Sequence, residues 1–244
     1  MPWKNLSKVW KGCNRKICFL WQEKNYATID PMEVIPLDAD TQAYIYIVFS
    51  ATPYFIGKAI RCITGEIYNH ASIALDEDLT RMYGFSRRYY RTPLYGGFVR
   101  ESLSRYHLKG KRAHIRICRL SVTQTQYHML ETLLEDMHAN RQAYIYNHLS
   151  ALGTLLHRPV KAKQAYTCIE FCIKILYDLG IDVDPNRYYS VGQVEQQLRH
   201  LAIYTGPVPA SSEYDSAYFA KKPITHPART TCREILKLIP RLGA

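Results

Sequence analysis

Two stretches of the chain contain residue types that could carry out nucleophilic chemistry. The later one, Ala165–Leu176, reads AYTCIEFCIKIL and places Cys168 directly after Thr167. Threonine is a common helix N-cap, so the pattern predicts a helix whose first turn contains Cys168. Unpaired N–H groups and the positive end of the helix dipole stabilise a thiolate there, and the same N–H groups can hold an oxyanion. Cys168 is therefore the candidate nucleophile.

A thiolate also needs a base or an ion-pair partner, which is normally a histidine. Of the nine histidines, His70 opens a strand-like run, YNHASIAL, within the expected sheet. The other eight lie in a basic stretch, on a helix with acidic neighbours, near the ends of elements, or in regions without a clear pattern. Because strand residues alternate between faces, His70 shares its face with Ser72 and Ala74. These small residues predict that the Cys168 helix packs closely over that face.

Structural interpretations compete with this chemistry. Cys168 could be a small buried hydrophobe, as Cys172 one helical turn later could also be. A histidine at the start of a strand is often a satisfied surface or core residue. For Glu170, two residues after Cys168, we favour the role of an acid that stabilises the first helical turn.

The order of the two motifs resembles that of a known family. His70 in NHASIAL followed far downstream by Cys168 in YTCIEF is similar to the circularly permuted NlpC-like branch of the papain-fold superfamily. That branch includes YiiX/YaeF-like bacterial hydrolases and relatives of lecithin:retinol acyltransferase, and the resemblance covers roughly residues 43–180. In ordinary papain-type enzymes the cysteine comes first. The resemblance implies a permuted papain-like α+β fold, with a mainly antiparallel sheet, the histidine strand before the cysteine helix, and that nucleophile helix packed against the sheet.

The resemblance also implies roles for individual residues. Cys168 would be the nucleophile and His70 the general base of a cysteine peptidase-like hydrolase, amidase, esterase or acyltransferase that works through a thioester. It implies no cofactor and no metal. The family places a third polar residue on the strand after the histidine strand, but LTRMYGFS contains no His, Asp, Glu, Asn or Gln. We take Tyr83 as the residue that orients the imidazole, with Ser86 and the loop residue Glu101 as alternatives.

The remaining pattern predicts an α+β chain with three parts. A basic amphipathic segment covers 1–30, the catalytic domain covers 31–204, and an irregular extension with a short helix covers 205–244. The periodicities and turn signals predict strands over 43–50, 70–75, 79–86 and 113–120, helices over 52–65, 121–140, 167–180 and 190–200, and a loop over 90–103.

The net charge of +11 is unevenly placed. Eleven Lys/Arg and one acid lie between residues 81 and 119, and six Lys/Arg and one acid lie in residues 1–24. Apolar residues recur every three or four positions in that first segment, which is typical of a helix at an anionic membrane surface. A solvated surface and a helix packed on its own domain are the alternatives. A second hypothesis is an inactive papain-like scaffold that binds a membrane surface or nucleic acid through residues 81–119.

Bulk properties set further limits. The 244 residues, 47% of them hydrophobic, can form one large domain or two small ones. The sequence shows neither a run of about 20 apolar residues nor a secretory signal pattern, so we expect a cytoplasmic protein, peripheral at the membrane if residues 1–24 bind it. The seven cysteines are irregularly spaced without a C-x-x-C pair. This spacing argues against a zinc ribbon or a thioredoxin motif and indicates reduced thiols.

Overall fold

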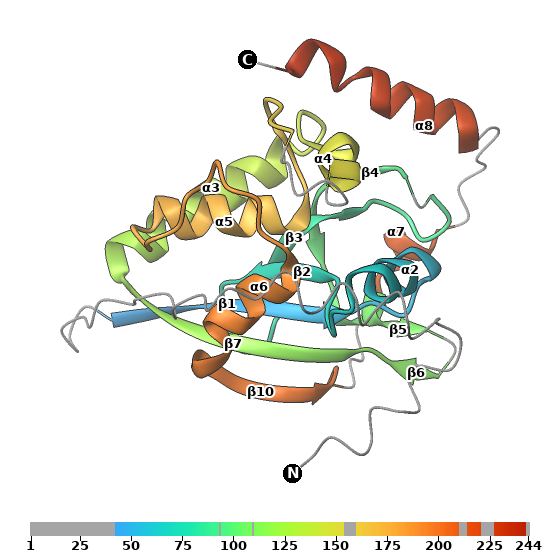
Figure 1. The fold of residues 1–244 in the computed structure, drawn as a ribbon. Coiled ribbons are helices and arrows are strands. Elements are labelled where there is room, and N and C mark those ends of the chain that lie inside the picture. Colours follow the sequence, from blue (N-terminus) through green and yellow to red (C-terminus); the bar gives the residue numbers. More distant parts are fainter. Residues whose placement is uncertain are drawn as a thin grey trace.

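A mainly antiparallel sheet forms the centre of the protein (Figure 1). The computed structural model describes residues 42–92, 94–108, 110–153, 160–209, 214–220 and 227–242. Within them an eight-stranded sheet has the order β10-β7-β1-β2-β3-β4-β8-β9, in which β8 and β9 are parallel and the other pairs antiparallel. Its strands are β1 (Gln42–Ala51), β2 (His70–Ala74), β3 (Met82–Arg87), β4 (Gly96–Glu101), β7 (His114–Thr123), β8 (Ile145–Tyr146), β9 (Ala165–Tyr166) and β10 (Ala202–Pro207). A small hairpin joins β5 (His107–Leu108) and β6 (Lys111–Arg112).

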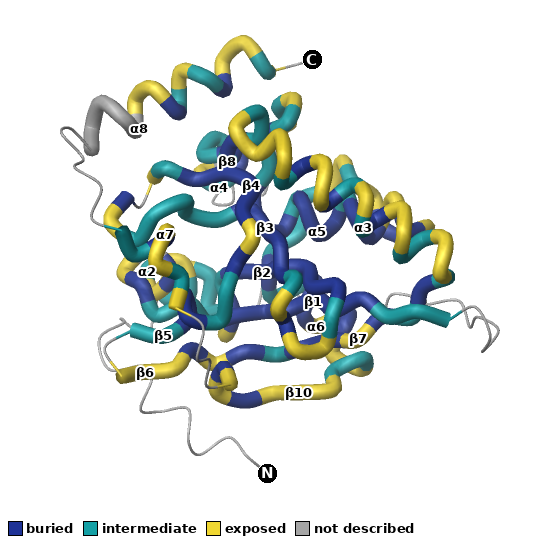
Figure 2. The backbone as a smooth tube through the Cα atoms, turned by 180° about the vertical axis from the view of Figure 1, so that it is seen from behind, coloured by how far each residue is buried: buried dark blue, intermediate teal, exposed yellow. Residues whose placement is uncertain are grey.

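Helices gather at two places on this sheet. In Figure 1 and in the reverse view of Figure 2, α3 and α5 lie together on one side, whereas α2 and α7 lie near the other end. The helices are α2 (Phe55–Thr64), α3 (Gln124–Ala139), α4 (His148–Gly153), α5 (Cys168–Asp178), α6 (Val191–Leu198), α7 (Ser216–Phe219) and α8 (Pro227–Leu236). Short 3-10 turns are η3 (Leu103–Tyr106), η5 (Arg199–Leu201) and η6 (Ile239–Arg241). Helices combined with this sheet confirm the α+β class.

Strand β1 is hydrophobic along its length because both of its faces are covered. Ile45, Ile47 and Phe49 belong to a helix-side core that includes buried residues of α3, α5 and α6. Tyr46 and Val48 belong to an opposite core on the other face of the sheet. The buried strands are the dark blue centre of Figure 2.

The predicted strands correspond to β1, β2, β3 and β7, but the predicted loop over 90–103 contains strand β4. The pair Gly96-Gly97 suggested a turn, whereas both residues lie inside β4. A Cβ at Gly96 would stand 2.8 Å from Cβ of Tyr146 in the next strand, so glycine there permits a close approach rather than a turn.

The predicted helices over 121–140, 167–180 and 190–200 correspond to α3, α5 and α6. Helix α2 ends at Gly65 with φ of 72°, as its sequence predicts. Its N-cap is Tyr54 rather than the expected Thr52. Thr52 instead exchanges hydrogen bonds with the side chain of Asn69, which ties the start of α2 to the start of β2.

Residues that directly follow 204 are part of the folded domain. Strand β10 pairs with β7, and Val208 is fully buried in the opposite core. The expected boundary between 204 and 205 therefore falls inside a strand. The expected N-terminal amphipathic helix lies outside the described residues.

The cysteines do not all match the expectation of reduced thiols. Cys118, Cys168, Cys172 and Cys232 are free, but Cys62 is disulfide-bonded. Within the described ranges, every helix is too short or too polar to cross a bilayer.

Candidate active site

Helix α5 begins at the candidate nucleophile. Thr167 is its N-cap, and Cys168 is the first helical residue, as the sequence predicts. The Thr167 hydroxyl accepts a hydrogen bond from the Glu170 N–H at 3.2 Å, and the Glu170 carboxylate accepts one from the Thr167 N–H at 2.8 Å. This reciprocal capping box fixes the first turn. The Cys168 side chain is consequently held at the N-terminus of the helix, where it is only 6% exposed.

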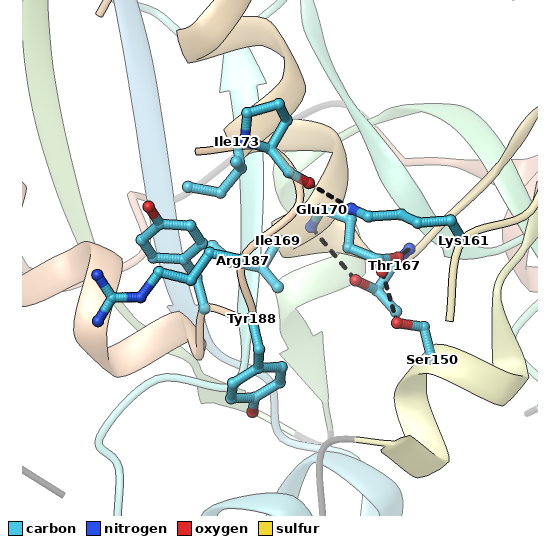
Figure 3. Close-up of a pocket in the computed structure, with 10 residues that line it drawn as sticks. Ser150, Lys161, Thr167, Ile169, Glu170, Ile173, Arg187 and Tyr188 are labelled. Atoms are coloured by element: carbon cyan, nitrogen blue, oxygen red, sulfur yellow. Dashed lines mark hydrogen bonds between the residues drawn. The ribbon is translucent and has the colours of Figure 1, made fainter. Parts of the chain in front are cut away.

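Glu170 has the structural role that its position suggests. Its carboxylate caps Thr167 and also accepts a hydrogen bond from the Ser150 hydroxyl of α4 (Figure 3). The nearby cavity measures about 20 Å³, which is room for about one water molecule. Lys161, which also lines it, donates to the Pro185 carbonyl. Glu170 therefore positions the first turn of helix α5.

The imidazole of His70 lies between a thiol and a carboxylate. Its Nε2 is 3.0 Å from Oε1 of Glu101 and 3.1 Å from the Ser72 hydroxyl. Cys168 lines the same cleft as His70 and is close enough to contribute to the raised pKa of the ring. Because Glu101 and Ser72 occupy Nε2, we infer that Nδ1 faces the thiol.

Helix α5 does not pack on the His70 face of β2, although the small residues on that face predicted this packing. Helix α5 packs with Ala71 and Ile73 in the helix-side core, whereas Ala74, on the His70 face, belongs to the opposite core. Glu101 and Tyr106 fill the space beside Ser72. Glu101 accepts hydrogen bonds from both hydroxyls, at 3.0 Å from Ser72 and at shorter range from Tyr106. The small residue Ser72 thus makes room for a carboxylate rather than for a helix.

His70 and Cys168 meet where β2 and β3 separate. The ladder between these strands consists of two pairs, Ile73↔Tyr83 and Ala74↔Met82, so the His70 end of β2 is unpaired with β3. Both Cys168 and His70 line the cleft at this end of the sheet. The separation gives the thiol on the helix side access to the imidazole.

A glycine lets Glu101 reach across the sheet. Glu101 pairs with Met82 in the β3–β4 ladder, and the next residue of β3 on the same face is Gly84. A Cβ at Gly84 would stand 3.0 Å from Oε1 of Glu101 and 3.2 Å from the Ser72 hydroxyl. The missing side chain therefore leaves the space through which the carboxylate contacts His70.

The orienting position is occupied by Glu101 and not by Tyr83. Tyr83 points into the helix-side core, where its ring stacks on Phe98 at 6.0 Å between centroids. Its place in the ladder opposite Ile73 puts it on the face away from His70. Ser86 does line the cleft, but the His70 ring bonds to Glu101 and Ser72 instead.

The buried surroundings fix the charges of the pair. Burial lowers the pKa of His70, but the Glu101 charge and the interactions with Cys168 outweigh it and raise that pKa from 6.5 to about 10. Burial raises the pKa of Glu101, but the charge and hydrogen bond of His70, with help from Arg105 and Tyr106, lower it from 4.5 to about 2. At neutral pH the pair is therefore an imidazolium and a carboxylate.

These groups open onto a cleft of about 420 Å³. Most of its wall is apolar or aromatic and comes from α2, β3, the turn before β4, α4 and α8, with Tyr54, Ile60, Phe85, Leu94, Leu152 and Ile235 among its residues. A largely apolar cavity with a few converging polar groups is the usual form of a small-molecule site.

Two further polar side chains, Tyr146 and His148, enter the cleft. Strand β8 pairs with β9 so that Tyr146 lies opposite Tyr166, two residues before Cys168. Burial, followed by the charges of Cys168 and Glu170, raises the pKa of Tyr146 well above its ordinary value, so its hydroxyl keeps its proton. The His148 ring packs on Tyr146 at 5.1 Å, and burial lowers the pKa of His148. The site therefore contains a protonated phenol and a neutral imidazole besides the Cys168–His70 pair.

Sequence reasoning named Cys168, His70 and, as an alternative, Glu101, and it missed the roles of Ser72, Tyr106 and Tyr146. Glu101 was visible as the single acid in a basic stretch. Its contact with His70 depends on strand β4, which was not predicted, and on the register between β3 and β4. Tyr146 gave no comparable signal because β8 is only two residues long.

Comparisons with protein-family models, curated proteins and solved structures find no match to this chain. Among the described residues, no three His, Cys, Asp or Glu side chains are grouped so that they could hold a metal ion.

Proposed function

We propose that the chain is a thiol-dependent hydrolase or acyltransferase that works through a Cys168 thioester. One observation carries the proposal: a cysteine at a helix N-terminus lines the same cleft as a histidine whose Nε2 is bound by a buried carboxylate. This is the arrangement of nucleophile, proton carrier and orienting group that nucleophilic catalysis requires.

The proposed reaction starts from a thiolate–imidazolium pair. The Cys168 sulfur attacks the carbonyl carbon of an ester or amide, and the carbonyl electrons move to oxygen. The tetrahedral intermediate then expels the alcohol or amine, which takes its proton from His70. A second nucleophile attacks the thioester and gives its proton to His70, and Cys168 leaves as the thiolate. Water as this nucleophile gives hydrolysis, and an alcohol or amine gives acyl transfer.

The oxyanion of the intermediate would be stabilised from two sides. The backbone N–H groups in the first turn of α5 lack intrahelical acceptors, as at every helix N-terminus. Tyr146 lines the same cleft, and burial together with the charge of Cys168 raises its pKa. Its hydroxyl therefore keeps its proton. We assign it the role of a hydroxyl donor to the oxyanion.

The permuted papain-like fold is part of this proposal. The strand that contains His70 precedes the helix that begins with Cys168, and that helix packs on a mainly antiparallel sheet. Both features agree with the permuted NlpC-like arrangement. A cytoplasmic location, with residues 1–24 at an anionic membrane surface, also remains a proposal.

Trapping the acyl-enzyme tests the proposed function. The protein is incubated with p-nitrophenyl acetate, quenched in acid and digested for peptide mass spectrometry. We expect one acetyl group on the Cys168 peptide, formed much more slowly in His70→Ala. His128→Ala is the matched control because His128 is an exposed histidine on α3. Acetylation of the exposed Cys232 at the same rate as Cys168 would contradict the proposal.

The alternative function, anion binding by an inactive scaffold, draws on residues 81–119. Three of the arginines in this stretch are neutralised within the protein, since Arg81 pairs with Glu131, Arg105 with Asp215 and Arg116 with Glu195. The count of charges in the sequence therefore overstates the basic surface. A more localised group of arginines carries the inference that follows.

A further inference from the structure

A second cleft, here called the arginine cleft, lies beside the first and measures about 540 Å³. Glu101, Arg105 and Tyr218 line both clefts, so β4, η3 and α7 contribute to the wall between them. Five basic side chains line the arginine cleft, namely Arg88, Arg100, Arg105, His138 and Arg141.

Both carboxylates in the lining of the arginine cleft are already bound. Glu101 is 3% exposed and interacts with His70, Ser72 and Tyr106. Asp215 accepts a hydrogen bond from Arg105 at 2.7 Å. Neither acid is therefore available to the other three arginines.

Arg88, Arg100 and Arg141 form no ion pair with any described carboxylate. Arg88 is held by the main-chain carbonyls of Arg141 and Tyr144, at 2.5 and 2.8 Å. Arg100 donates to the carbonyl of Thr80 at 2.9 Å. Such contacts fix the positions of guanidinium groups but leave their charges uncompensated.

The charge of Arg141 acts on two other basic groups of the cleft. Burial lowers the pKa of Arg88; Tyr95, Glu234 and Tyr89 oppose this effect, and the charge of Arg141 adds to it. Burial also lowers the pKa of His138, with further contributions from Arg141 and Arg100. An anion bound in the cleft would offset the positive charge of these arginines.

We propose that the arginine cleft binds the phosphate group of a small phosphorylated molecule or lipid headgroup, through Arg88, Arg100 and Arg141. Planar guanidinium groups match phosphate oxygens in pairs of charge-assisted hydrogen bonds. The cleft is larger than a phosphate ion, and Tyr214 and Tyr218 line it, so the remainder of the ligand can lie against aromatic rings. This inference does not depend on the chemistry of Cys168.

Calorimetric titration tests the proposal with inorganic phosphate and glycerol 3-phosphate as probes. The test variant is Arg100→Gln/Arg141→Gln. The matched control is Lys111→Gln/Arg112→Gln, which removes the same charge from the exposed strand β6 outside the cleft. We expect one site on the parent, affinity weakened about tenfold or more in the test variant, and no change in the control. Thermal unfolding verifies that both variants fold.

Flotation with vesicles distinguishes the two sources of phosphate. One set is phosphatidylcholine alone, and the other includes phosphatidic acid. If the parent is retained on the vesicles with phosphatidic acid, and the test variant but not the control is retained less, the ligand is a lipid headgroup. If the parent binds glycerol 3-phosphate in the titration but is not retained on these vesicles, the ligand is a free phosphorylated molecule. If neither phosphate nor glycerol 3-phosphate binds, or if both variants weaken binding equally, the proposal is overturned.

Discussion

At the scale of single residues, Glu101 sets the charge of His70. The carboxylate is buried, bound by two hydroxyls and 3.0 Å from the imidazole. An uncompensated buried charge is strongly unfavourable, so each member of the pair keeps the other ionised. His70 consequently acts in the proposed reaction as an imidazolium that stabilises a thiolate and donates a proton to the leaving group.

Glu101→Gln is expected to lower the pKa of His70 from about 10 towards or below its ordinary 6.5, because the negative charge disappears while burial remains. The ring would then lose its proton near neutral pH. Titration of the His70 resonances by NMR measures this change. An unchanged His70 titration in the variant would refute the assigned role of Glu101.

Tyr146→Phe removes the proposed oxyanion donor and retains the ring. We expect acetylation of Cys168 by p-nitrophenyl acetate to slow about a hundredfold to a thousandfold, the range seen for loss of such donors. Alkylation of Cys168 by iodoacetamide forms no oxyanion and is expected to stay within about twofold of the parent. Equal slowing of both reactions would show that Tyr146 only shapes the cleft.

At the scale of secondary-structure elements, the position of Cys168 follows from a local capping motif, whereas glycines make room for the residues around it. The Thr167–Glu170 capping box fixes α5 locally, which is why the sequence alone predicted the position of the thiol. Gly84 and Gly96 instead act through strands brought together by the fold. The pair Gly96-Gly97 resembles a loop signal in the sequence, and this similarity concealed strand β4.

Gly84→Ala is expected to separate Glu101 from His70, because the new Cβ would stand 3.0 Å from the carboxylate and 3.2 Å from Ser72. The pKa of His70 should fall as it does in Glu101→Gln, with a lower melting temperature. Gly206→Ala is the matched control, since its Cβ would meet only the end of the Tyr204 side chain in β10. An unchanged His70 pKa in Gly84→Ala would show that the carboxylate does not need this space.

At the scale of the whole molecule, the sequence predicted the local parts of the site and not their pairing. The strands β1, β2, β3 and β7 and the helix α5 follow from periodicity and capping. The partner of His70 depends on the β3–β4 register and on the separation of β2 from β3, and neither is encoded within one segment. Tyr83 was expected because the family places the orienting residue on the strand after the histidine strand, and the sequence does not reveal the register of the intervening turn.

The His70–Glu101 pair should give the stability of the protein a distinct pH dependence. His70 has a raised pKa, so its contribution is complete below pH 6.5 and is lost as the pH rises towards about 10. Glu101 has a lowered pKa, so its contribution is present above pH 4.5 and is lost as the pH falls towards about 2.

The stability difference between parent and Glu101→Gln is therefore expected to be greatest between pH 4.5 and 6.5. Above that window it should shrink by up to about 1.4 kcal/mol per pH unit. Urea unfolding at several pH values measures it. A difference that grows with alkaline pH would contradict the ionised pair.

The most direct measurement is the pH dependence of iodoacetamide labelling at each cysteine, in the parent and in His70→Ala. Buried Cys118 and Cys172, whose pKa values burial raises, and the exposed Cys232 serve as internal references. We predict that Cys168 reacts faster than Cys232 at mildly acidic pH, where ordinary thiols are protonated, and that His70→Ala abolishes this advantage. If Cys168 is inert, or reacts like Cys232 with or without His70, Cys168 is a structural cysteine and the proposed catalytic function is wrong.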